Sequence, residues 1–286
     1  MSPNLEIVAD SNCRRHSLCN TRGPARDGIE VRELSRHLRT NVAGLRRFVG
    51  IFTGNHRFAN LCVVRLIDEV AAEPGVVSLA STPRIGLFRL LLCILNEFSE
   101  AAAFVDNGRD ILCPDYLVRQ AYLLSAIEGF SPKDIAEILD LTVECVDQMS
   151  AQFAQTELTA PQAQILVIED EPLIAWQIER LVDQLGHRIL GVATTRKQAA
   201  KFLRNVEPDI LLADVQLADG STGIDTVADI LAHINVPAIF VTADPDRLNS
   251  GQLVEPLFVV AKPFIPVTLK AVISHALFLS NARRQL

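Results

Sequence analysis

The second half of the chain alternates short apolar runs with longer segments in which apolar residues recur at helical spacing. The first run, residues 165–168, has no polar face and ends in the carboxylates Glu169, Asp170 and Glu171. Buried parallel strands have this pattern, and their functional groups lie at the carboxyl ends. Comparable strands are expected at residues 188–192, 210–213, 238–242 and 257–261, with helices at 173–185, 195–205, 223–233, 244–251 and 266–282. This alternation predicts a doubly wound α/β domain with a parallel sheet.

The first half of the chain has helical periodicity and predicts a separate all-α domain. Two helices fit residues 38–73, with a break at Thr53-Gly54-Asn55, and a third helix fits residues 83–100. Residues 1–36 instead mix several arginines with Gly, Pro, Asn and Ser and show little apolar periodicity. That composition predicts a flexible extension before the helical domain.

Residues 114–157 have the pattern of a helix-turn-helix. Ser131 is the expected N-cap of a short helix that begins with Pro132, and a tight turn at residues 140–142 precedes the next helix. A recognition helix needs Lys or Arg for phosphates and base edges, but the chain has neither between Lys133 and Arg180. The two helices carry carboxylates instead, at Asp134, Glu137, Asp140, Glu144 and Asp147. We therefore expect no direct DNA binding through this motif.

The composition indicates the environment of the protein. With 286 residues, 49% of them hydrophobic, the chain can bury two cores, while no uncharged run is long enough to span a bilayer. The six cysteines lack a disulfide spacing and the first residues do not resemble a signal peptide, so we predict a cytoplasmic protein. The net charge of −7 argues against a general nucleic-acid binder. Cys13, His16 and Cys19 could ligate a metal, but they lack an obvious fourth ligand and we predict no zinc site.

Polar groups with complementary chemistry end the predicted strands. Glu169 and Asp170 follow the first strand, Asp214 the third, Thr242 the fourth and Lys262 the fifth. In a flavodoxin-like sheet, with strand order 2-1-3-4-5, ligands bind where the order reverses, between the first and third strands. Crowded carboxylates repel one another unless a cation joins them, and Mg²⁺ suits a site that also holds water and phosphate oxygens. Asp214 is then the expected nucleophile toward a phosphoryl group, whose oxygens Thr242 and Lys262 can bind.

This constellation resembles the CheY-like receiver domain, over residues 163–286. The matching residues are Glu169-Asp170, Asp214, Thr242 and Lys262-Pro263-Phe264, in the order of the family. The resemblance implies that a sensor histidine kinase phosphorylates Asp214 and that the peptide before Pro263 is cis. It also implies that Glu169, Asp170 and Asp214 hold Mg²⁺ together with the backbone carbonyl of Gln216. A receiver catalyses only its own phosphorylation and dephosphorylation, so we expect a signalling protein and not an enzyme.

One receiver position departs from the pattern. The aromatic residue that usually lies three positions before the lysine is Val259 here, and Phe258 is its neighbour. We therefore hypothesise that coupling runs through Thr242 and residues 244–251. A Phe258→Ala protein with full phosphorylation-dependent partner binding would exclude Phe258 as the switch.

The helix-turn-helix resembles region 4 of ECF-type sigma factors, through Glu128-Gly129-Phe130-Ser131 and residues 135–139. We expect a sigma-like domain at residues 37–157, with a region 2-like part at 38–75 and a region 4-like part at 114–157, a linker at 158–163 and a receiver at 164–286. This order resembles the PhyR family of general stress response regulators, as do the motifs Arg46-Arg47-Phe48, Thr53-Gly54 and Gly186-His187-Arg188. The resemblance implies an anti-anti-sigma mechanism. Phosphorylation would release an intramolecular contact between receiver and sigma-like domain, which then binds a NepR-type anti-sigma factor and frees the sigma factor.

Two other functions remain open from the sequence alone. A DNA-binding response regulator would use residues 131–157 and give a salt-dependent, sequence-specific gel shift, although the acidic helices argue against it. A true sigma factor with a regulatory receiver would instead co-purify with core RNA polymerase. The kinase, the stress and the oligomeric state are not predicted.

Overall fold

The computed structural model describes residues 28–77, 80–101, 114–204, 206–217, 220, 222–244 and 257–284. The chain divides into two compact units: one combines Met1–Val49 with Arg57–Phe153, and the other combines Gly50–His56 with Ala154–Leu286. The possible metal ligands Cys13, His16 and Cys19 lie outside the described residues, as does most of the predicted helix at 244–251. The predicted domain boundaries stay a prediction.

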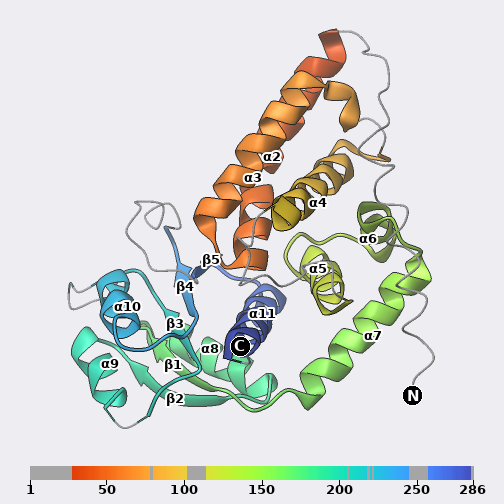
Figure 1. Ribbon diagram of the computed structural model, residues 1–286. Helices are drawn as coiled ribbons and strands as arrows, with labels where there is room; N and C mark the ends of the chain where they lie inside the picture. The colour runs from red at the N-terminus through yellow and green to blue at the C-terminus, as the bar shows by residue number, and fades with distance from the viewer. Residues whose placement is uncertain are drawn as a thin grey trace. The chain divides into compact units, whose positions relative to one another are not determined.

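The first unit is built from helices, as the periodicity of the sequence predicted (Figure 1). In chain order the elements that lie wholly or mostly in this unit are α2 (Gly28–Thr53), α3 (His56–Ala72), η2 (Pro74–Val76), α4 (Pro83–Ala101), α5 (Pro114–Ala126), α6 (Pro132–Leu139) and α7 (Val143–Thr159). Helix α2 begins at Gly28, inside the stretch that we expected to be a flexible extension. Helix α7 runs to Thr159, into the predicted linker.

The helix-turn-helix has the predicted local chemistry. The Ser131 hydroxyl accepts a hydrogen bond from the Asp134 backbone N–H at 3.2 Å, and the Asp134 carboxylate accepts one from the Ser131 backbone N–H at 3.0 Å. This capping box satisfies two backbone donors at the start of α6. At the other end of α6, Asp140 adopts a left-handed conformation with φ of 55°, which ends the helix before α7.

The second unit is a five-stranded parallel sheet in the order β2-β1-β3-β4-β5. The strands are β1 (Gln164–Ile168), β2 (Arg188–Ala193), β3 (Ile210–Ala213), β4 (Ala238–Thr242) and β5 (Leu257–Ala261). The helices are α8 (Pro172–Gln184), α9 (Arg196–Phe202), α10 (Gly223–Leu231) and α11 (Pro266–Arg284). Helices α8 and α11 cover one face of the sheet, and α9 and α10 cover the other (Figure 1). The predicted fold class and strand order are confirmed.

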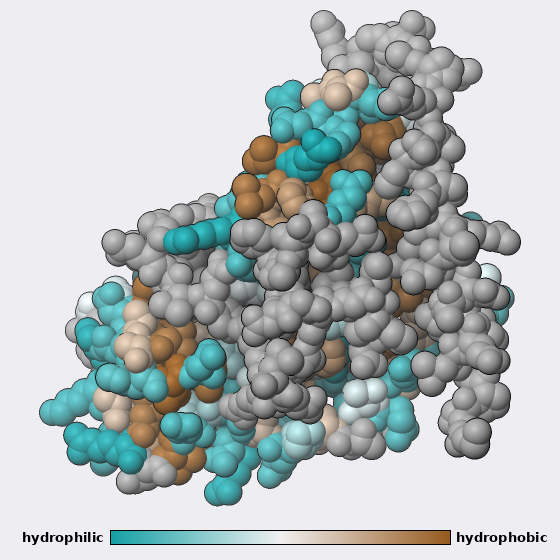
Figure 2. Space-filling view, in the orientation of Figure 1, coloured by the Kyte–Doolittle hydropathy of each residue, from teal (hydrophilic) through white to brown (hydrophobic). Residues whose placement is uncertain are grey.

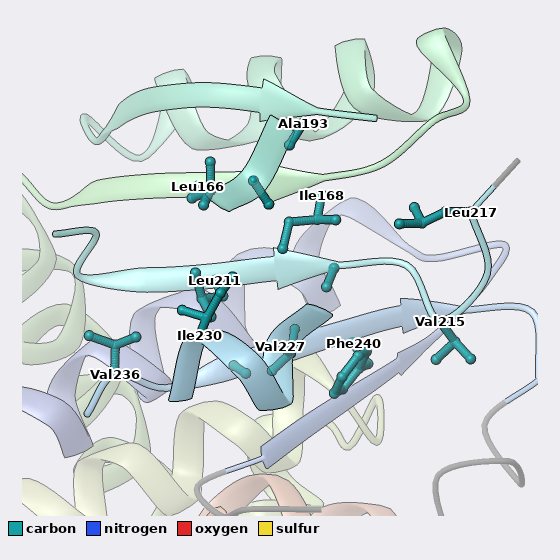
Figure 3. Close-up of a cluster of buried hydrophobic side chains, with 13 residues drawn as sticks. Leu166, Ile168, Ala193, Leu211, Val215, Leu217, Val227, Ile230, Val236 and Phe240 are labelled. Atoms are coloured by element: carbon teal, nitrogen blue, oxygen red, sulfur yellow. The ribbon is translucent and has the colours of Figure 1, made fainter. Parts of the chain in front are cut away.

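Apolar side chains from the strands and from α10 form the core on the α9 and α10 face (Figure 3). Leu166, Leu211 and Phe240 contribute from neighbouring strands, and Val227 and Ile230 close the layer from α10. Because these residues are buried, the strands are held rigidly, and so are the polar residues that follow them.

Phe258 and Val259 take part in different layers of the second unit. Phe258 is fully buried, whereas Val259 is partly buried and packs against the cluster on the α9 and α10 face. Successive residues of a strand point to opposite faces of the sheet, so Phe258 cannot take the place of an aromatic at position 259. Within the described part of the chain, none of the helices is long and apolar enough to cross a membrane.

Candidate phosphorylation site

The site residues are fixed by main-chain hydrogen bonds that continue the sheet beyond its strands. The backbone N–H of Glu169 donates to the Ala193 carbonyl at 2.9 Å, and that of Asp214 donates to the Ile168 carbonyl at 2.9 Å. The backbone N–H of Lys262 donates to the Thr242 carbonyl at 2.7 Å. The ends of β1, β3, β4 and β5 therefore meet at one edge of the sheet, where the strand order reverses.

Lys262 and Asp214 form the closest charged contact of the site. The Lys262 ammonium nitrogen Nζ lies 2.8 Å from Asp214 Oδ2 and 2.9 Å from Glu169 Oε2. Both side chains of the Lys262–Asp214 pair are 11% exposed, and that of Glu169 is 1% exposed, so the contacts are weakly screened by water. Lys262 therefore lies beside Asp214, and its predicted pairing with a phosphoryl group stays a prediction.

The three carboxylates among the predicted metal ligands come together. One carboxylate oxygen from each of Glu169, Asp170 and Asp214 lies within 4.8 Å of the others. Hard cations such as Mg²⁺ prefer carboxylate oxygens, so this donor set suits such an ion. The residues present therefore fit a magnesium site.

Burial and charge act in opposite directions on the ionisable groups. Burial raises the pKa of Glu169, and this effect outweighs the hydrogen bond and positive charge of Lys262. Burial alone would lower the pKa of Lys262, but its hydrogen bonds to Asp214 and Glu169 and their charges raise the pKa overall. Lys262 is therefore a permanent cation of the site at neutral pH.

The loop after β3 shapes the surroundings of Asp214. The Gln216 backbone N–H donates to Asp214 Oδ1 at 3.3 Å, and the Gly223 backbone N–H donates to the Val215 carbonyl at 2.9 Å. A Cβ atom on Gly223 would overlap the carbonyl oxygen of Asp214, so only glycine lets α10 begin so close to this strand end. The Thr242 hydroxyl, on β4, accepts a hydrogen bond from the Asp244 backbone N–H at 3.1 Å.

Glu171 joins the site, although sequence reasoning gave it no role there. Its Oε1 lies 3.2 Å from Lys262 Nζ, while its side chain is 62% exposed. Its position after Glu169 and Asp170 was visible in the sequence, but the contact depends on how the loop after β1 turns. The Lys262–Pro263 peptide is cis, as the family resemblance implied.

Two protein-family models match the chain. The response regulator receiver domain matches residues 165–274, and the sigma-like domain of response regulator PhyR matches residues 116–160. The phyllosphere-induced regulator PhyR of Methylorubrum extorquens is 40% identical over 253 residues, which cover 84% of this chain and 93% of that protein. This chain belongs to the PhyR family. Its receiver and sigma-like domains make it a response regulator, so the expectation of a signalling protein is confirmed.

Two solved structures of PhyR proteins are similar to this chain over most of their length. The response regulator PhyR of Brucella abortus is 37% identical, with a TM-score of 0.73 over 88% of this chain and 96% of that one. The anti-anti-sigma factor PhyR of Bartonella quintana is 36% identical, with a TM-score of 0.73 over 88% of this chain and 98% of that one. A second structure of the Bartonella protein is a complex with the anti-sigma factor NepR (37% identity, TM-score 0.36, covering 86% and 99%).

Proposed function

We propose that this PhyR-family protein is an anti-anti-sigma factor whose activity is controlled by phosphorylation of Asp214. The observation that carries the proposal is the contact of Asp214 with Lys262 inside a cluster of carboxylates. In this mechanism a sensor histidine kinase supplies the phosphoryl group. A carboxylate oxygen of Asp214 forms the new bond to phosphorus, and the kinase histidine is the leaving group.

A magnesium ion would be held by Glu169, Asp170 and Asp214, together with the backbone carbonyl of Gln216. When bound, it would neutralise charge on the phosphoryl oxygens during transfer. The chain itself supplies the other interactions. Lys262 would pair with a phosphoryl oxygen, and Thr242 would donate its hydroxyl hydrogen to another. The contact with Asp244 does not use this hydroxyl hydrogen, because toward the Asp244 backbone N–H the Thr242 oxygen acts as an acceptor.

The sigma-like domain would deliver the output by binding an anti-sigma factor of the NepR type. Helices α6 and α7 begin with Asp134 and Glu144 in their first turns, which favours protein partners over DNA phosphates. Helix α3 offers an apolar surface, because Leu61, Val64 and Ile67 are 60%, 56% and 36% exposed. Figure 2 shows apolar side chains at the surface in the region where Figure 1 places α3. Neighbouring exposed apolar side chains on one helix face favour a protein interface.

In the proposed cycle the unphosphorylated receiver masks the sigma-like domain, and phosphorylation shifts the equilibrium toward the unmasked state. Couplings of this kind amount to about 1–3 kcal/mol, which changes partner affinity roughly 5- to 150-fold. The cytoplasmic location expected from the sequence stays a prediction.

The proposal is tested with Asp214→Ala. Wild-type protein should be labelled by acetyl phosphate with Mg²⁺ and should then bind a NepR-type anti-sigma factor in a pull-down. The variant should lose both responses. Asp183→Ala, which removes an exposed carboxylate from α8, serves as the matched control. Normal labelling of Asp214→Ala would reject Asp214 as the acceptor, and a phosphorylation-dependent gel shift would favour the DNA-binding alternative.

A further inference from the structure

The first unit holds a buried carboxylate that the phosphorylation mechanism does not use. Glu128 follows α5, and its side chain is 3% exposed. Its Oε1 accepts hydrogen bonds from Arg47 of α2, at 2.7 Å from Nη2 and 3.2 Å from Nε. Its Oε2 lies 3.1 Å from Arg84 Nη2 at the start of α4. One carboxylate therefore joins two helices to the loop that leads into the helix-turn-helix.

Arg84 contacts this loop in two further ways. Its Nη2 donates to the Glu128 backbone carbonyl at 2.7 Å, and its guanidinium carbon lies 4.1 Å from the centre of the Phe130 ring. A guanidinium over an aromatic face is attracted by the ring, and a planar group can satisfy both contacts at once. A lysine in this place could not reproduce the arrangement.

The backbone is adapted to let Glu128 approach α2. A Cβ atom on Gly44 would lie 3.0 Å from Glu128 Oε2, which is tighter than an ordinary contact. Gly129, directly after Glu128, has a φ of 69°, a left-handed conformation that favours glycine. Gly44 therefore leaves room for the Glu128 carboxylate, and Gly129 allows the backbone turn that follows it.

An aromatic layer lies along the same junction. The rings of Phe48 on α2 and Phe88 on α4 meet edge to face at 5.8 Å, and Phe88 meets Phe130 edge to face at 5.0 Å. All three residues are buried. A second polar link lies nearby, since the Ser81 backbone N–H and hydroxyl both donate to the Glu137 carboxylate of α6 at 2.6 Å.

We propose that Glu128, Arg47 and Arg84 form an ionic lock that fixes the helix-turn-helix relative to α2 and α4. The lock makes Glu128 a positioning residue: it holds both parts of the sigma-like domain in one arrangement, which the anti-sigma factor recognises. This role for the partner rests on the proposed function, whereas the lock itself does not. The Arg47 and Arg84 side chains are 48% and 39% exposed, but the carboxylate that joins them is buried. A buried carboxylate that loses its partners destabilises its surroundings.

The lock is tested in the full-length protein by hydrogen–deuterium exchange. In Glu128→Gln, amides of residues 44–49, 84–88 and 124–131 should exchange roughly tenfold faster, because the neutral side chain no longer balances two guanidinium groups. Glu69→Gln is the matched control, since Glu69 pairs with Arg65 within α3 and both side chains are substantially exposed. The control should exchange as the wild type does. Unchanged exchange in Glu128→Gln would overturn the lock.

A second variant separates the lock from helix stability. Ala is a better helix former than Gly, so Gly44→Ala should slow exchange in α2 if the position matters only for the helix. If the lock exists, the new methyl group displaces the Glu128 carboxylate and residues 124–131 exchange faster, although all three charges remain. Slower or unchanged exchange in residues 124–131 would contradict the proposal.

The partner role is tested by binding of a NepR-type anti-sigma factor to the phosphorylated protein. We expect Glu128→Gln to raise the dissociation constant roughly tenfold and Glu69→Gln to leave it unchanged. Equal or tighter binding by Glu128→Gln would mean that the arrangement need not be locked for recognition. Failure of the wild type to bind would reject the proposed function, while the exchange experiment would still decide on the lock.

Discussion

Two charge clusters, one in each unit and each built around buried carboxylates, have opposite compositions. In the receiver unit, the carboxylates of Glu169, Glu171 and Asp214 share the ammonium group of Lys262. In the sigma-like unit, two guanidinium groups share the carboxylate of Glu128. The receiver cluster has carboxylates in excess and can accept a further cation, whereas the Glu128 carboxylate is already satisfied by the chain.

This difference matches the two roles that a switch protein needs. A site that receives a signal must change its charge, and incompletely neutralised carboxylates make such a change favourable when Mg²⁺ and a phosphoryl group arrive. A surface that is recognised by a partner must keep its shape, which a satisfied buried carboxylate supports. The two clusters should therefore respond differently to the same kinds of substitution.

The largest effect is expected for Asp170→Asn, which removes a proposed magnesium ligand from the receiver cluster. Labelling by acetyl phosphate with Mg²⁺ should fall by about a thousandfold, because the metal would supply several kcal/mol of charge stabilisation. The rate of label incorporation measures the effect, and Asp183→Asn provides a carboxylate-to-amide control on α8. Wild-type labelling of Asp170→Asn would show that Asp170 does not contribute to the phosphorylation site.

The next largest effect is expected for Glu128→Ala, in the other cluster. The free energy of unfolding of the sigma-like domain should fall by about 2 kcal/mol, because the charge-assisted hydrogen bonds of a buried carboxylate are lost, while the half-exposed guanidinium groups of Arg47 and Arg84 can turn to water. The chain's two tyrosines, Tyr116 and Tyr122, lie in α5 and report unfolding of this unit, whereas its one tryptophan, Trp176, reports on the receiver. Glu69→Ala should change the tyrosine transition by less than about 1 kcal/mol. Equal transitions for the two variants would remove the distinction between a buried carboxylate and a surface ion pair.

The receiver cluster could be predicted from the sequence, and the Glu128 cluster could not. Asp214 and Lys262 each follow an apolar run, and parallel strands bring their carboxyl ends to one edge of a sheet. The apolar runs and the known geometry of parallel sheets were therefore enough to predict that Asp214 and Lys262 lie close together. Arg47 and Glu128 lie 81 positions apart in the sequence. No local sequence pattern indicates how the elements that carry them pack against each other. Both motifs were visible as family-like sequences, but their contact follows from tertiary packing alone.

Glu171 and the start of α2 were missed for related reasons. The contact of Glu171 with Lys262 depends on the loop conformation after β1, which the carboxylate run itself does not determine. Helix α2 begins at Gly28, and glycine is a poor helix former, so propensity gave no reason to start a helix there. The role of Thr242 was inferred from its place at a strand end and that of the Gln216 carbonyl from resemblance, and both stay predictions.

A third prediction separates input from output. Leu61→Asp places a charge on the exposed apolar face of α3 and should weaken binding of a NepR-type anti-sigma factor by about tenfold, since anchoring apolar contacts are lost. Labelling of Asp214 should be unchanged, because α3 contributes nothing to the receiver cluster. Asn60→Asp adds the same charge at the neighbouring exposed position and is the control in a titration of affinity. If both variants weaken binding equally, charge and not the apolar surface determines the interaction.

The smallest effect is expected for Glu169→Gln, and it should have the opposite sign to that of Glu128→Ala. Because burial raises the pKa of Glu169, the folded protein binds this proton more tightly than the unfolded chain. The stability gained is fully present below the ordinary pKa of about 4.3 and is lost as the pH rises through the folded-state pKa.

A glutamine at position 169 stays neutral, so it should raise the free energy of unfolding at pH 7 by about 1 kcal/mol in the absence of divalent cations. Below pH 4 the variant and the wild type should be equally stable, because Glu169 is then protonated in both states. Urea unfolding followed by Trp176 fluorescence measures the difference within the receiver. A less stable variant at pH 7 would mean that the pairing of Glu169 with Lys262 outweighs its burial. In that case ionic contacts would stabilise both clusters. The excess of carboxylates at the receiver site would then cost no stability that a bound cation could restore.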